Sequence, residues 1–193
     1  MDTKEKIIDA AFELFSTKGY LGTTTKEIAQ HANVCEVTVF RHFGTKEGIF
    51  DAVLRANSIL PEFQKITVKT DDLSLEETLN VITKKLYFTL VNKKKFIRII
   101  LSELNQYSEK VIEIYKNFIE EMDELLVNIL EKKQKKYPLK NIDIKIAVKG
   151  FIGMIFSYFQ INEIFLDKKI STQEIDNALS TFVQIFLRGI EDI

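Results

Sequence analysis

The chain has 193 residues, of which 46% are hydrophobic, enough for the core of one large domain or of a small domain joined to a medium one. With only 7 Gly and 2 Pro, little material is left for hairpins, and this favours helices. A single cysteine excludes an internal disulfide and suits a reducing cytoplasm. The formal net charge of −1 lacks the basic excess of many nucleic-acid-binding proteins.

The N-terminal segment is predicted to form a helix over Thr3–Lys18, with Gly19 ending it. Its charged and amphipathic character does not fit a signal peptide. Apolar residues recur at helical spacing and indicate a face that packs on the following helices. They are Ile8, Ala11, Phe12, Leu14 and Phe15.

The segment Thr23–Lys46 is predicted to form two short helices joined by a tight turn. The first helix begins with a capping box, in which Thr24 and Glu27 each satisfy a free backbone amide of the other. Asn33 follows this helix, and asparagine tolerates the left-handed conformation that lets a chain leave a helix sharply.

The second short helix is predicted over Glu36–Phe43, with Cys35 at its N-cap and Gly44 at its end. Apolar residues lie three and four positions apart along it, so one side can pack inward. They are Val37, Val39, Phe40 and Phe43. Two short helices with a turn of this length have the shape of a DNA-binding helix-turn-helix.

The region from about Lys4 to Leu54 also carries many residues at fixed spacing. The pattern is Gly19-Tyr20-x-x-Thr23-Thr24-x-x-x-Ile28-Ala29-x-x-Ala32-x-Val34-x-x-x-Thr38-x-Phe40-x-His42-Phe43-x-x-Lys46-Glu47. It resembles the N-terminal signature of the TetR family of transcriptional regulators. Three positions depart from that signature. Asn33 replaces a common glycine, Cys35 replaces the usual capping serine, and Phe40 replaces a tyrosine whose hydroxyl reaches a phosphate.

The resemblance implies a set of DNA-contacting positions. They are Thr25, Lys26, Cys35, Glu36, Val37, Thr38, Phe40, Arg41, His42 and Lys46. Phosphate contacts are expected from the two helix starts that hold Thr25, Lys26 and Lys46. Glu36 suits a cytosine amino group, Val37 or Thr38 a thymine methyl, and Arg41 guanine or phosphate. For each of them the alternative is an ordinary solvated helix surface.

Two questions stay open in this region: whether its charges suit DNA binding, and whether its one thiol has a redox role. Residues 1–50 hold six Lys or Arg and seven Asp or Glu, so DNA binding depends on local placement of the cations on one side. A thiol at a helix N-terminus such as Cys35 can have a lowered pKa, which allows a redox role. The alternative is a small residue tolerated at a poor cap, since the chain has no second cysteine.

The rest of the chain is predicted to be helical as well. Helix boundaries are indicated near Pro61, at capping boxes Ser74/Glu77 and Ser171/Glu174, and at Tyr137-Pro138. Further helices are expected at about Phe96–Leu104, Glu109–Lys136 and Ile142–Leu166. We therefore predict an all-α protein with a helix-turn-helix DNA-binding domain at residues 1–50 and a larger helical domain at 51–193.

The resemblance assigns ligand binding and dimerisation to that larger domain. Aromatic side chains are candidates for a ligand pocket, although core packing explains them equally well. They are Phe88, Phe96, Tyr115, Phe118, Phe151, Phe156 and Phe159. Homodimerisation through the last two helices is implied, with Ile155, Tyr158, Phe182 and Phe186 as interface candidates.

No Gly-rich phosphate loop, nucleophile elbow or metal-ligand spacing is present in the sequence, so no enzyme, cofactor or metal is expected. Apolar runs fall short of the ~20 residues of a membrane span, so no membrane partner is expected. The sequence thus predicts a cytoplasmic, dimeric repressor of a palindromic operator, released by a small apolar or aromatic inducer. Two alternatives are a helix-turn-helix protein that acts mainly through a protein partner, and a small-molecule-binding or enzymatic protein that has kept the motif unused.

Overall fold

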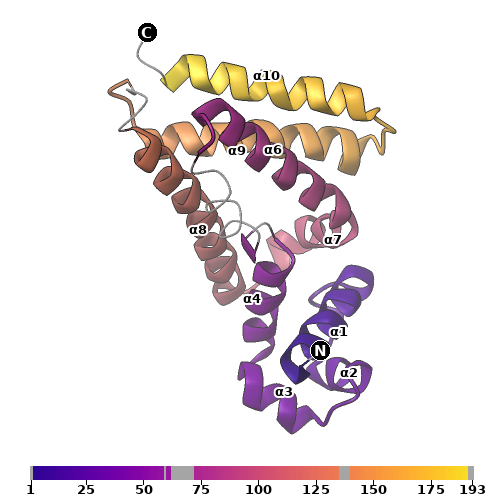
Figure 1. Ribbon diagram of the computed structural model, residues 1–193. Helices are drawn as coiled ribbons and strands as arrows, with labels where there is room; N and C mark the ends of the chain where they lie inside the picture. Colours follow the sequence, from indigo (N-terminus) through magenta and orange to yellow (C-terminus); the bar gives the residue numbers. More distant parts are fainter. Residues whose placement is uncertain (1, 59, 62–71, 135–139, 191–193) are drawn as a thin grey trace. The chain divides into compact units, whose positions relative to one another are not determined.

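The computed structural model describes residues 2–58, 60–61, 72–134 and 140–190, and every regular element in these ranges is a helix (Figure 1). The predicted all-α fold is confirmed. The elements are α1 Thr3–Lys18, α2 Thr25–His31, α3 Glu36–Phe43, α4 Lys46–Ala56, α6 Leu75–Asn92, α7 Lys94–Glu103, the 3-10 helix η1 Leu104–Gln106, α8 Glu109–Gln134, α9 Ile144–Phe159, the π-helix η2 Gln160–Phe165 and α10 Thr172–Ile190. The predicted break at Tyr137-Pro138 lies outside the described residues.

The chain forms two compact units. The first comprises Met1–Ser58 with Lys93–Ile119, and the second comprises Ile59–Asn92 with Glu120–Ile193. The first unit thus adds α7, η1 and the start of α8 to the N-terminal helices. The predicted domain boundary at residue 50 falls inside α4. Only α1, α2 and α3 lie entirely on its N-terminal side.

The first unit is built around α1. This helix buries Ile7, Ala10, Ala11 and Phe15 against α2, α4 and α7. The buried face of α1 is centred slightly differently from the predicted one. It includes Ile7, which was not predicted, whereas Ile8, Phe12 and Leu14 are only partly buried. Tyr20 packs its ring against the rings of Phe15, Phe50 and Tyr107, with centroids 5.5, 4.9 and 5.6 Å away. This aromatic cluster fixes the turn that leads from α1 into α2.

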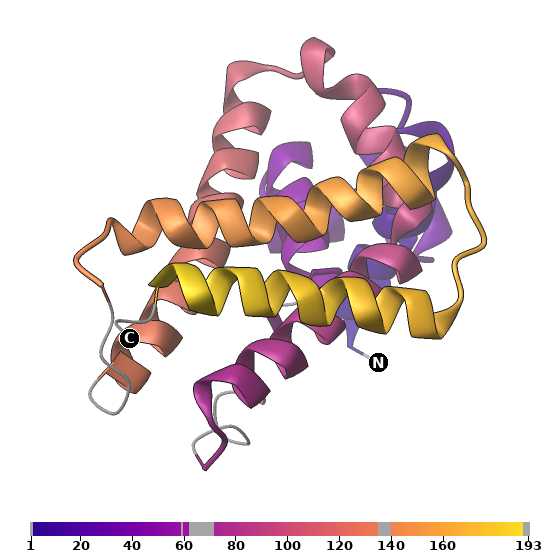
Figure 2. The same ribbon diagram turned by 90° about the horizontal axis from the view of Figure 1, so that it is seen from above.

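The second unit packs α6, α9 and α10 on one another, and α9 and α10 run side by side (Figure 2). Phe151 of α9 stacks on Phe186 of α10 with ring centroids 4.4 Å apart. The Ser74/Glu77 capping box is present at the start of α6, where each residue's backbone N–H donates to the other's side chain. The interface of these three helices forms much of the core of the unit, and α8 adds further buried apolar residues such as Leu126 and Leu130.

Helix α4 ends earlier than the sequence predicted. It stops at Ala56, before the expected end near Leu60 and before Pro61. The last turn is closed at Asn57, whose side-chain amide and backbone N–H both donate to the Val53 carbonyl, at 3.0 Å each. Asn57 itself has φ −103° and ψ 11°, outside the helical region, and the helix ends there.

Gly19 allows a close approach between the end of α1 and α7. Its backbone has φ +79°, and a Cβ at this position would overlap the carboxylate oxygen of Glu103. Gly44 also has a positive φ, +72°, but its missing Cβ would meet nothing within 4 Å. The two positions differ in ψ as well, which is 166° at Gly19 and −49° at Gly44, and of the two only Gly19 has the contact with Glu103.

We expect Gly44→Ala to lower the free energy of unfolding by about 1–3 kcal/mol, because a residue with a Cβ rarely adopts φ +72° with ψ −49°. Gly19→Ala should cost at least about 1 kcal/mol more, because the Glu103 carboxylate must move as well. Urea denaturation of the two variants measures the difference. Equal losses would show that the contact with Glu103 is easily relaxed.

Candidate nucleic-acid interface

Helices α2 and α3 form the predicted helix-turn-helix. Asn33 adopts φ +54°, which confirms the expected left-handed turn, and the N–H of Val34 donates to the Ala29 carbonyl at 3.0 Å. Gly44 caps the end of α3 as expected. The turn is thus held by backbone hydrogen bonds and by a residue that tolerates its conformation.

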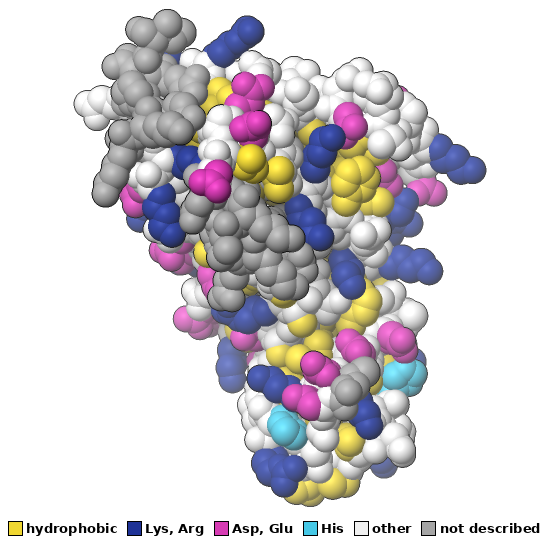
Figure 3. All heavy atoms as spheres, viewed as in Figure 1, with side chains coloured by type: hydrophobic (Ala, Val, Ile, Leu, Met, Phe, Trp, Pro, Cys, Tyr) yellow, Lys and Arg dark blue, Asp and Glu magenta, His cyan; other side chains and the backbone are white. Residues whose placement is uncertain are grey.

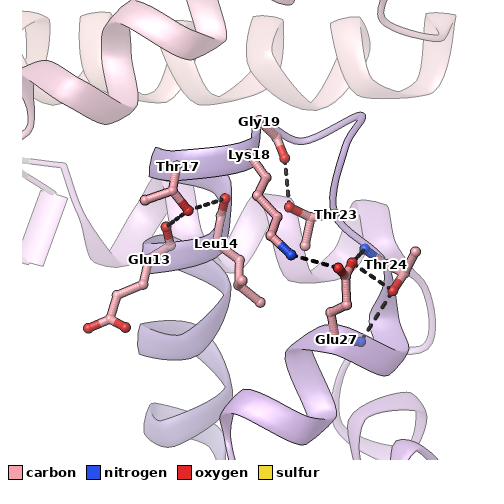
Figure 4. A network of polar contacts seen from close by, with 8 residues as sticks. All are labelled: Glu13, Leu14, Thr17, Lys18, Gly19, Thr23, Thr24 and Glu27. Atoms are coloured by element: carbon pink, nitrogen blue, oxygen red, sulfur yellow. Dashed lines mark hydrogen bonds and ion pairs between the residues drawn. The ribbon is translucent and has the colours of Figure 1, made fainter.

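The capping box at the start of α2 is part of a larger polar network (Figure 4). The Glu27 N–H donates to Thr24 Oγ1 at 3.2 Å, and Glu27 Oε2 accepts the Thr24 N–H at 2.8 Å. Lys18 of α1 places its ammonium 2.7 Å from Glu27 Oε1. Hydrogen bonds from Lys18 and Thr24 lower the pKa of Glu27 to about 2. The start of α2 is therefore tied to the end of α1.

The starts of α2 and α3 are joined by a side-chain hydrogen bond. The Thr25 hydroxyl donates to Glu36 Oε1 at 2.7 Å. Both residues were predicted as separate DNA contacts, and no sequence pattern indicated that they meet. Their pairing joins the two helix starts and orients Glu36, while Lys26 beside them is exposed.

Four apolar residues of α3 were predicted to form its inward side, and only two of them pack inward. Val39 is buried at 1% exposure and Phe43 packs against the core, but Val37 is 76% and Phe40 46% exposed. Arg41 lies one turn from Val37 on the same exposed face. Only one side of a helix can pack, and the pair at positions 39 and 43 occupies it. The face of Val37, Phe40 and Arg41 is therefore open to a partner.

Three further candidate positions lie around this face. Cys35 is exposed and makes no capping hydrogen bond, while its Sγ lies 3.0 Å from Thr38 Oγ1. Hydrogen bonding to Thr38 lowers the pKa of the Cys35 thiol. His42 is exposed near the end of α3. A mixture of acidic and basic side chains surrounds these helices on the face seen in Figure 3, with no large basic patch.

Lys46, at the start of α4, is half-buried. Its Nζ lies 4.2 Å from the centroid of the Tyr20 ring, in cation–π geometry. Burial lowers the pKa of Lys46, and the charge of Glu103 opposes this shift. In this arrangement the ammonium faces the ring, so a phosphate contact requires the side chain to turn outward.

Glu103 organises the same region, although nothing in the sequence distinguished it from a solvated helix end. Its Oε2 accepts the Tyr20 N–H at 2.9 Å and the Tyr107 hydroxyl at 3.1 Å. Burial, and then the Glu103 charge, raise the pKa of Tyr107 above its ordinary value. This carboxylate holds the turn between α1 and α2 to α7 and η1.

The predicted ligand-pocket residues are divided between the two units. Phe96, Tyr115 and Phe118 pack on the core of the first unit. Phe88, Phe151, Phe156 and Phe159 belong to the second, where Phe151 and Phe159 are fully buried and Phe88 is 38% exposed. Each group belongs to the core or surface of its own unit, and the assignment to a ligand stays a prediction.

The dimer-interface candidates are largely used inside the protomer. Ile155 is 1% and Phe186 6% exposed. Tyr158 and Phe182 pack edge to face with centroids 5.6 Å apart and are partly buried. Among the described residues, no three His, Cys, Asp or Glu side chains form a group suited to a metal ion.

The geometry defines a class of protein, a helix-turn-helix DNA-binding protein with a helical second unit. The family model of bacterial regulatory proteins of the TetR family matches residues 7–53. The model of the AefR-like transcriptional repressor C-terminal domain matches residues 77–189, more than half of the chain.

Individual relatives agree with these models. The HTH-type transcriptional regulator YvkB of Bacillus subtilis is 31% identical over 188 residues, 97% of each chain. The negative transcriptional regulator IcaR of Staphylococcus aureus is 46% identical over 48 residues, 25% of this chain and 26% of that protein. FadR of Bacillus subtilis, solved in complex with stearoyl-CoA, has the same fold, with a TM-score of 0.77, 19% identity and coverage of 97% and 99%.

The chain therefore belongs to the TetR family and is a transcriptional regulator. The members of this family are DNA-binding proteins that act as dimers, not enzymes. The resemblance in the helix-turn-helix region is confirmed, and it extends through the second unit.

The Lys18–Glu27 pair predicts an acid-sensitive start of α2. Because the pKa of Glu27 is lowered from 4.5 to about 2, its contribution to stability is present above pH 4.5 and is lost as the pH falls towards 2. In Lys18→Gln the pKa of Glu27, measured by NMR titration, should move back towards 4.5. Lys6→Gln, on the same helix, should leave it unchanged. An unchanged pKa in Lys18→Gln would contradict the assignment.

Proposed function

We propose that the protein is a repressor that binds a near-palindromic DNA operator as a homodimer and releases it when a small molecule binds the second unit. The observation that carries this proposal is the open face of α3, where Val37, Phe40 and Arg41 project from a helix anchored by Val39. An exposed face of this kind at the second helix of a helix-turn-helix suits insertion into the major groove.

The proposed contacts follow from exposure and chemistry. Val37 and Phe40 suit thymine methyl groups, and Arg41 suits guanine or a phosphate. Lys26 at the start of α2 suits a phosphate, because the free amides there also favour an anion. Two copies of α3 from a dimer would read half-sites about 34–36 Å apart, one turn of DNA.

The proposed dimer surface lies on the exposed face of α9 and α10. Gly150, Gly153 and Gly189 are exposed, and a Cβ at any of them would meet nothing within 4 Å. A glycine inside a helix costs about 1 kcal/mol relative to alanine, and the protomer gains no close contact in return. Ile146 and Ile185 are exposed at 68% and 54% on the same two helices. A second copy packing closely here accounts for both features.

This surface also bears on the question of membranes. The segment Ile144–Phe165 is long and apolar enough to cross a membrane by length and composition alone, which the sequence analysis did not anticipate. In the structure it packs on α6 and α10, and Glu163 within it is buried. We propose that its exposed side is covered by the partner protomer, in a protein of the cytoplasm.

A ligand of apolar or aromatic character suits the aromatic residues of the second unit. The repressor assignment is supported by the C-terminal family model, whose description is a transcriptional repressor. The alternative of a protein that acts through a protein partner predicts that small molecules leave DNA binding unchanged.

Selection of bound duplexes from a random pool tests the DNA-binding proposal. A symmetric site should be enriched. Arg41→Ala should relax the preference at one base pair of each half-site by about 1–3 kcal/mol. Lys26→Ala should weaken binding to all sequences and reduce the slope of log affinity against log salt by about 1 per contact.

Lys169→Ala, an exposed lysine of the second unit, is the matched control and should change neither quantity. Enrichment of an asymmetric site, or equal behaviour of Arg41→Ala and the wild type on all sequences, would contradict the proposed docking of α3.

Gly153→Leu tests the dimer surface. In the protomer a Cβ at this exposed position meets nothing within 4 Å, and leucine gains about 0.8 kcal/mol of helix propensity over glycine, so the fold should be retained. At a close helix contact between protomers it should clash and shift the protein towards monomer in sedimentation velocity. Asn128→Leu, an exposed position of α8, should remain dimeric. A dimeric Gly153→Leu would place the interface elsewhere.

A further inference from the structure

The first residues of α2 and α3 form a hydrogen-bonded pair at the edge of the open face of α3. The Thr25 hydroxyl donates to Glu36 Oε1 at 2.7 Å, and both residues are half-buried. Glu36 lies next to Val37 and one turn before Phe40, so it borders the exposed apolar side chains of that face. A carboxylate is thus restrained by a hydrogen bond beside the surface that the proposed function places in the major groove.

The same hydrogen bond limits what Thr25 can offer to DNA. A threonine hydroxyl has one hydrogen to donate, and phosphate oxygens only accept hydrogen bonds. With that hydrogen directed to Glu36, the Thr25 side chain has no donor left for a phosphate. In this arrangement Thr25 acts on the carboxylate of Glu36 rather than on the DNA backbone.

Glu36 keeps most of its own hydrogen-bonding capacity. An ionised carboxylate accepts at about four lone-pair sites on its two oxygens, and the Thr25 hydroxyl occupies one of them. In the part of the chain that the structure describes, no ion pair joins Glu36 to a lysine, arginine or histidine. A negative charge close to DNA phosphates is repelled by them, so its presence there is favourable only where a base donates to it.

Few groups in the major groove can donate to such an acceptor. Cytosine presents its N4 amino group, whereas guanine presents the acceptors O6 and N7 and thymine presents the acceptor O4. Adenine donates from N6, but its N7 acceptor lies beside that group and repels a carboxylate oxygen. A restrained carboxylate therefore favours cytosine and disfavours the other three bases at the same position.

We propose that Glu36 is a specificity-determining residue that selects a cytosine in each half-site of the operator, and that Thr25 is a positioning residue that aims its carboxylate. This inference rests on the proposed function, in which α3 reads the major groove, and it names one base of the recognised sequence. Glu36 attracts the cytosine amino group and also rejects bases that present acceptors, so it contributes to specificity in both ways.

Selection of duplexes from a random pool with Glu36→Gln tests this assignment. The wild type should enrich a C·G pair at one position of each half-site, with about a tenfold loss of affinity for any other pair there. Glutamine accepts from adenine N6 and donates to N7, so Glu36→Gln should change the preference from cytosine to adenine and leave the other positions unchanged. Glu124→Gln, the same change at an exposed acid of α8, is the matched control and should keep the cytosine.

Two variants of Thr25 test its positioning role. Thr25→Val keeps the shape of the side chain and removes the hydroxyl, whereas Thr25→Ser keeps the donor. In fluorescence anisotropy with duplexes that differ at this base pair, Thr25→Val should reduce the discrimination for cytosine by about threefold or more, and Thr25→Ser should retain it. Equal weakening of all duplexes by Thr25→Val would indicate a phosphate contact and would contradict the positioning role.

The outcomes separate this inference from the proposed function. An unchanged base preference in Glu36→Gln, or a symmetric wild-type site without the C·G pair, would overturn the inference and leave the DNA-binding proposal standing. Failure of the wild type to enrich any symmetric site would overturn both. Circular dichroism checks that each variant is folded.

Discussion

The hydrogen bonds of Glu103 hold together the part of the molecule that presents α3. One carboxylate oxygen accepts the Tyr20 N–H and the Tyr107 hydroxyl, which ties the turn after α1 to α7 and η1. Gly19 makes room for that carboxylate, and Lys46 lies over the Tyr20 ring. The start of α4 and the helices before it therefore share one partly buried network. A charged hydrogen bond in such a setting is costly to leave unmade, so these elements are expected to move together.

Through the Glu103 contacts, α7 is part of the same compact unit as the helix-turn-helix. The sequence predicted a division at residue 50, whereas the contacts group α7 and the start of α8 with the first four helices. Helix α8 begins in the first unit and ends in the second, so it is a continuous covalent link between them. A ligand can alter DNA binding only through different affinities for two conformations of the protein.

Sequence patterns predicted the local structure well because the signals are local. The Thr24/Glu27 capping box and the left-handed Asn33 depend on neighbouring residues, and both are present. Local signals could not predict which apolar residues pack against helices that are distant in the sequence. Val37 and Val39 have equal apolar character, and only the core shows that Val39 is the one that packs.

The same limit applies to the candidate sites. The pairing of Thr25 with Glu36, the role of Glu103 and the burial of Ile155 within the protomer each depend on helices brought together by folding. Glu163 is buried and lies four residues after Phe159, a spacing that is visible in the sequence. A charged residue at a core position is the signal that would have identified it.

We propose that two copies of α3 read DNA from a symmetric dimer. Hydroxyl-radical footprinting of a selected duplex can detect this arrangement, because it maps the protected sugars on both strands. We expect two protected regions related by a dyad and separated by about one helical turn, 10–10.5 base pairs between centres. A single protected region, or two regions without that symmetry and spacing, would contradict it.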